Sequence, residues 1–174
     1  MGVGTLSIKL IGTHIIISIV EFFLMIPLMS LWENNEIYQW LIGLLLIFFL
    51  WFIIYSDISY ISQSDLKRNI FWKPKGFIIG LIASIPVLIL YILAIIIEAK
   101  VNYAEIVLRI CLAPYTKLFI TFQDKMPYIA IIPIAILPIL SGLSYFDGQR
   151  RRKKILDVIK ESDAQRAEKS KVDR

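Results

Sequence analysis

The chain has 174 residues, of which 57% are hydrophobic and 19% are charged, and its formal net charge is +5. A soluble domain cannot cover so large an apolar fraction, so the composition excludes an ordinary soluble protein and predicts a membrane protein. The charged residues gather at the ends of long apolar runs and in the tail after Asp147. A nucleic-acid-binding surface would instead spread basic residues over a folded surface, among polar and aromatic side chains that contact bases. No nucleic-acid partner is therefore expected.

Four long apolar runs predict four membrane-spanning helices, because lipid forces a spanning backbone to satisfy its own hydrogen bonds. They cover residues 10–32, 37–55, 76–97 and 128–146. Each run has about 20 residues, which at 1.5 Å per residue crosses a hydrocarbon core of about 30 Å. The first run is expected to be a retained span and not a signal peptide, since it lacks a basic n-region and an A-x-A cleavage site.

The basic residues between the runs predict the orientation, because short segments rich in Lys and Arg resist translocation. Residues 57–75 contain Lys67, Arg68, Lys73 and Lys75, whereas the turn at residues 33–36 contains no cation. We therefore expect a multi-pass protein of the plasma membrane with both termini in the cytoplasm. The mixture of acids, amides and cations at residues 56–76 predicts a solvated docking loop.

Residues 104–122 are apolar enough to suggest a fifth span but contain Arg109, Pro114 and Lys117. A central Arg or Lys costs about 2.5–3.5 kcal/mol on insertion scales. A fifth span with a cytoplasmic tail would also place the amino terminus and the basic connection outside. We therefore expect either a helix in the outer interface or a re-entrant hairpin bent at Pro114.

The chain divides into an all-α transmembrane domain at residues 1–148 and a basic, partly helical cytoplasmic tail at residues 149–174. At roughly 1 kcal/mol per cation near an anionic leaflet, the start of the tail could bind anionic lipid head groups. The alternative is that these cations only stop transfer and set orientation. Beyond Lys160 the tail is almost entirely polar, and we expect it to stay mobile or to become ordered on a partner. The candidate lipid contacts are Arg150, Arg151, Arg152, Lys153 and Lys154.

Only the first run holds ionisable residues in its interior, where their cost makes them candidates for function. His14, Ser18 and Glu21 are spaced i, i+4 and i+7, which places them on one helix face. In a low dielectric Glu21 favours its protonated form and could exchange a proton with His14 as a relay partner. The alternative is structural, with Glu21 bonded to a neighbouring helix and His14 at the membrane surface.

The sequence contains no calcium loop, phosphate-binding glycine run, His-Glu-x-x-His motif or nucleophile elbow. Cys111 is the only cysteine, which excludes an internal disulfide and the ordinary structural zinc arrangements. We therefore expect no catalytic residues, no metal and no cofactor, and we interpret Cys111 as a packing residue.

Two stretches resemble uncharacterised small multi-span membrane proteins of low-GC Gram-positive bacteria. The first is Lys75-Gly76-Phe77-Ile78-Ile79-Gly80-Leu81-Ile82-Ala83-Ser84-Ile85-Pro86, and the second covers residues 135–148 and the cations that follow. The resemblance implies a bacterial plasma membrane and supplies no functional residues.

Three functions follow from these patterns. The leading hypothesis is a non-enzymatic accessory, scaffold or interaction subunit that binds other membrane proteins, or itself, through helix packing and the tail. The second is a transport or channel component, proton-linked through His14 and Glu21 or holin-like, which would act as an oligomer because four spans leave little room for a pathway. An intramembrane enzyme is the least favoured, since apart from Glu21 the spans offer only hydroxyls and His14.

Overall fold

The computed structural model describes residues 2–31, 35–97, 103–122 and 126–172. The described part of the chain is helical apart from short connections and contains no strand, which confirms the predicted all-α class. Trp32, the last residue of the first predicted span, lies outside the described residues.

Four helices are long and apolar enough to cross a membrane, as expected of a multi-pass membrane protein. They are α1 (Val3–Leu31), α2 (Glu36–Lys67), α3 (Lys75–Ile96) and α7 (Ile131–Val172). The predicted span at residues 37–55 lies inside α2, and the one at residues 76–97 extends one residue past the end of α3. Residues 128–146 begin in a separate short helix, α6 (Met126–Ile129), before continuing in α7.

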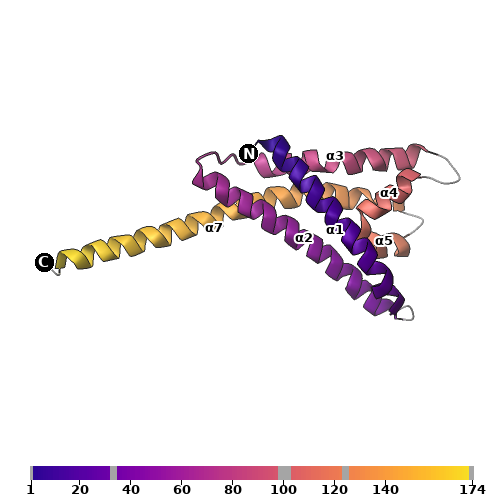
Figure 1. The fold of residues 1–174 in the computed structure, drawn as a ribbon, viewed down its shortest axis with the longest axis horizontal. Helices are drawn as coiled ribbons and strands as arrows, with labels where there is room; N and C mark the ends of the chain where they lie inside the picture. Colours follow the sequence, from indigo (N-terminus) through magenta and orange to yellow (C-terminus); the bar gives the residue numbers. More distant parts are fainter. Residues whose placement is uncertain (1, 32–34, 98–102, 123–125, 173–174) are drawn as a thin grey trace.

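Helix α7 packs against both α2 and α3, and α1 covers the bundle by packing against the same two helices. Figure 1 shows the resulting shape: the helices splay toward one end, and α7 leaves the bundle at the other end as a single helix. We call these the Glu36 end and the Lys67 end, after the first and last residues of α2.

The segment between α3 and α7 forms three short pieces, α4 (Tyr103–Cys111), a 3-10 turn η1 (Ala113–Tyr115) and α5 (Thr116–Thr121). The longest of these, α4, has 9 residues, which is too short to cross a bilayer. The helix breaks beside Pro114, because proline cannot donate a backbone hydrogen bond and crowds the preceding turn. None of these described pieces is among the helices long and apolar enough to be a candidate span. The pieces lie at the Glu36 end of the bundle (Figure 1).

The solvated loop that was predicted at residues 56–76 was wrong in part. Residues 56–67 form the last turns of α2 instead of a loop, because Ser59, Ser62 and Asp65 are buried against the bundle. In the tail, α7 continues as a helix to Val172. Its residues are mostly good helix formers such as Lys, Glu, Arg and Ala, so the polar surface itself favours the helix.

Glycines bring α3 and α7 into close contact. A Cβ atom added at Gly76 would lie 2.7 Å from the carbonyl oxygen of Ser141, and one at Gly80 would lie 2.7 Å from the Cα atom of Pro138. Membrane helices use small residues in this way because close backbone approach increases van der Waals contact. The two stretches that resemble other membrane proteins, residues 75–86 and 135–148, are thus largely the two sides of this interface.

Candidate functional site

The polar face of α1 points into the bundle. His14, Ser18 and Glu21 are 7%, 0% and 1% exposed, so the spacing predicted their common face. His14 therefore does not lie on the surface of the bundle. The buried face of α1 packs against α2, α3, α4 and η1.

Ser18 connects the middle of α1 to the broken segment. Its hydroxyl donates a hydrogen bond of 2.8 Å to the backbone carbonyl of Cys111, the last residue of α4. The final carbonyls of a helix have no partner within the helix, so this bond satisfies an acceptor that the helix itself leaves unpaired. The sequence could not predict this contact, because every residue has a backbone carbonyl and the residue type at position 111 does not mark it as an acceptor.

Glu21 is an acidic residue in a buried site that offers its carboxyl group no hydrogen-bond partner among the described residues. Both carboxyl oxygens are buried, and neither has a hydrogen-bond partner among the described residues. A buried carboxylate without a cation or donors costs many kcal/mol, so this group must hold a proton or receive a partner from elsewhere. It does not bond to His14 directly: seven residues along one helix correspond to about 10 Å of rise.

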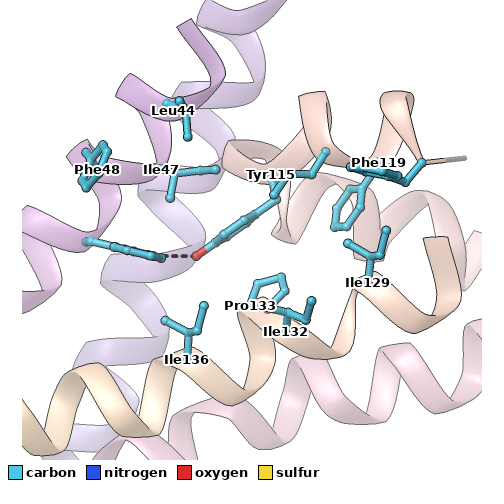
Figure 2. Close-up of a pocket in the computed structure, with 12 residues that line it drawn as sticks. Leu44, Ile47, Phe48, Tyr115, Phe119, Ile129, Ile132, Pro133 and Ile136 are labelled. Atoms are coloured by element: carbon cyan, nitrogen blue, oxygen red, sulfur yellow. Dashed lines mark hydrogen bonds between the residues drawn. The ribbon is translucent and has the colours of Figure 1, made fainter. Parts of the chain in front are cut away.

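His14 lies instead beside a pair of aromatic side chains. The indole N–H of Trp51 donates a hydrogen bond of 2.7 Å to the hydroxyl of Tyr115 (Figure 2). These two residues and His14 line a small cavity of about 10 Å³. That volume is about the smallest that holds one water molecule, so a proton path from His14 to Glu21 would need further groups.

A second polar cluster closes the Lys67 end. The ammonium of Lys75 lies 2.6 Å from an Asp65 carboxylate oxygen, to which the Tyr145 hydroxyl also donates a bond of 2.8 Å. All three side chains are buried, and Phe71 stacks on the Tyr145 ring. The cluster ties α2, α3 and α7 together. The sequence had suggested a solvated loop for Asp65 and Lys75, and this was wrong because each residue is only 5% exposed.

The five cations predicted to contact lipid, residues 150–154, have different surroundings in the structure. Arg151 donates a bond of 2.7 Å to Asp147 and one of 2.8 Å to the Tyr55 hydroxyl, which itself donates to Asp147. Arg151 thus helps to hold α7 on α2. Arg152 is half-buried, with an Nε atom that has no partner among the described residues. The remaining three cations, Arg150, Lys153 and Lys154, are exposed.

An apolar cleft of about 330 Å³ lies between α2, α5 and the start of α7. Figure 2 shows its walls, with Ile47 and Phe48 on one side, Tyr115 and Phe119 on another and Ile136 below. We call it the α2–α5–α7 cleft. Its volume falls within the range of about 300–1,000 Å³ that is usual for small-molecule sites.

Within the ranges that the structure describes, no three His, Cys, Asp or Glu side chains lie close enough to share a metal ion. The fold and its buried polar groups define a multi-pass α-helical membrane protein with a long helical extension. No protein-family model, no curated protein and no solved structure matches the chain.

Proposed function

We propose that this protein is a small non-enzymatic subunit of a bacterial plasma membrane that binds another protein through the free part of α7. The observation that carries the proposal is the extension of α7 beyond the bundle (Figure 1). The 21 residues from 152 to 172 form about 31 Å of helix beyond Arg151, at 1.5 Å per residue. Ile155, Val158 and Ile159 are 45%, 64% and 47% exposed there, and they share one face of the helix.

The proposed membrane arrangement puts this extension in the cytoplasm together with the amino terminus. The Lys67 end carries the basic connection, and the positive-inside bias places such an end in the cytoplasm. The broken segment then enters from the outer side as a re-entrant hairpin. Its contacts support this over an interfacial helix, because Ser18 and Trp51, which it meets, lie near the middle of α1 and α2.

Purification in mild detergent tests the docking role. The full chain is expected to co-purify with a stable partner, either another protein or a second copy. The variant Ile155→Ser/Ile159→Ser should lose it, because the apolar stripe is removed. The variant Asp157→Ser/Lys160→Ser should keep it, since these residues lie on other faces and the net charge is unchanged. A chain that is a partnerless monomer, or a partner that both variants retain, would refute the proposal.

The exposed cations at the start of the extension give it a second contact. Arg150, Lys153 and Lys154 have the positions expected of residues that hold a helix near anionic lipid head groups. Arg151 is less suited to this role, because it is already bound by Asp147 and Tyr55.

Glu21 favours one other function, a proton-linked or holin-like transport or channel component that acts as an oligomer. An unpartnered carboxyl group in the centre of a bundle is what a proton-binding site requires. Reconstitution in liposomes with an internal pH dye tests this function. It predicts proton flux that Glu21→Gln abolishes, and a monomer without flux would exclude it.

A further inference from the structure

The α2–α5–α7 cleft opens on the side of the bundle. Its rim residues Leu44, Phe48 and Ile132 are 44%, 62% and 54% exposed. Its floor is closed by Ile47 and Phe119, which are buried. Because the helices on either side can cross a membrane, such an opening faces the hydrocarbon of the bilayer.

The cleft covers part of one leaflet. Along α2 it is lined from Leu44 to Trp51. This distance corresponds to about 10 Å of helix, roughly a third of a hydrocarbon core of about 30 Å. At the deep end the Trp51 indole N–H donates to the Tyr115 hydroxyl oxygen, and the lining that a chain in the cleft meets is apolar.

Lys117, which directly precedes the cleft residue Leu118, lies beside the shallow end of the cleft. Lys117 is buried, and its ammonium donates a bond of 2.9 Å to the Gln39 amide oxygen and lies 5.8 Å from the centre of the Trp40 ring. No carboxylate among the described residues forms an ion pair with it. An ammonium has three donors, so Lys117 has hydrogen-bonding capacity left for an anion.

We propose that the cleft binds one acyl chain of an anionic phospholipid and that Lys117 binds its phosphate. The cleft supplies apolar surface for part of the chain, and Lys117, which forms no ion pair with a described carboxylate, supplies the head-group contact. Burial of a charge is favourable only when an opposite charge accompanies it, and a lipid phosphate provides that charge within reach of the same cleft. This site is separate from the cations of α7, which lie at the opposite end of the bundle.

Quenching of Trp51 by brominated lipid tests the proposal. The probe is the full chain with Trp32, Trp40 and Trp72 replaced by phenylalanine, so that Trp51 is the only indole. It is placed in vesicles of phosphatidylcholine that contain a small fraction of acyl-brominated lipid, either phosphatidylglycerol or phosphatidylcholine. The attraction between one cation and one anionic lipid, about 1 kcal/mol, corresponds to about fivefold tighter binding of phosphatidylglycerol than of phosphatidylcholine. Brominated phosphatidylglycerol is therefore expected to reach the same quenching of Trp51 at a roughly fivefold lower mole fraction.

Two variants assign the preference to Lys117. Lys117→Gln should make the two lipids equivalent, whereas Lys117→Arg should retain the preference because it keeps the charge. Lys73→Gln is the matched control, since it removes one exposed cation from the Lys67 end and should change nothing. Equal quenching by both lipids in the unmodified probe, or a preference that survives Lys117→Gln, would overturn the proposal. If Lys117→Gln does not fold, the comparison of the two brominated lipids in the unmodified probe still tests the proposal.

Discussion

Replacing Lys75 by methionine removes one half of the buried ion pair while keeping most of the side-chain volume. Asp65 would then keep the Tyr145 hydroxyl as a donor but lose its counter-charge. Both side chains of the pair are only 7% exposed, so water cannot replace the ammonium. Breaking such a buried pair typically costs about 3–5 kcal/mol in the free energy of unfolding, which is two to four orders of magnitude in the folding equilibrium constant.

The chain supplies its own control for this variant. Lys9 and Asp57 form an ion pair of the same length, 2.6 Å, but their side chains are 48% and 21% exposed. Lys9→Met is therefore expected to cost less than about 1 kcal/mol. The double variant Asp65→Asn/Lys75→Met should recover most of the loss, because no buried charge remains.

Equilibrium unfolding in mixed micelles of a mild detergent and dodecyl sulfate, followed by circular dichroism, measures these free energies. The expected order of stability is unmodified chain, Lys9→Met, the double variant and then Lys75→Met. If Lys75→Met and Lys9→Met were equally stable, or if the double variant were no more stable than Lys75→Met, the buried cluster would not hold the Lys67 end together.

The same titration checks three further predictions. Gly76→Ala should lower the free energy of unfolding by about 1–3 kcal/mol because the new methyl group meets the backbone of α7, whereas Gly12→Ala, with open space around it, should be neutral or slightly stabilising. Glu21→Gln should change stability by less than about 1 kcal/mol if the carboxyl group holds a proton, and a loss of several kcal/mol would mean that it is ionised and paired. In a double-mutant cycle, Trp51→Phe and Tyr115→Phe should show a coupling of about 0.6–1.7 kcal/mol, and independent effects would contradict the hydrogen bond.

The sequence predicted the four long helices because each apolar run has the roughly 20 residues that a helix needs to cross a bilayer. It also predicted that His14, Ser18 and Glu21 share a face, since helical periodicity alone decides this. It could not predict which helix they meet. Ser18 bonds to a backbone carbonyl 93 residues away, and no pattern of residue types marks such a contact.

The wrong prediction of a solvated loop at the Lys67 end has one physical cause. Hydropathy places a helix end where apolar residues stop, but α2 and α7 continue as helices after leaving the predicted spans. Asp65 in the extension of α2 is neutralised by Lys75 and accepts a hydrogen bond from Tyr145, so charged residues that suggest a loop are part of the core. The burial of these residues depends on how three helices pack together, and the sequence pattern of a single helix does not contain that packing.

All of these functional proposals depend on the membrane arrangement, which single-cysteine labelling in intact and permeabilised cells tests most directly. In a Cys111→Ser background, Tyr103→Cys and Thr121→Cys should react with an impermeant maleimide from outside, because both ends of a re-entrant hairpin lie on the outer side. Lys73→Cys and Ser162→Cys should react only after permeabilisation. Labelling of positions 103 and 121 from opposite sides, or of position 73 or 162 in intact cells, would contradict the account.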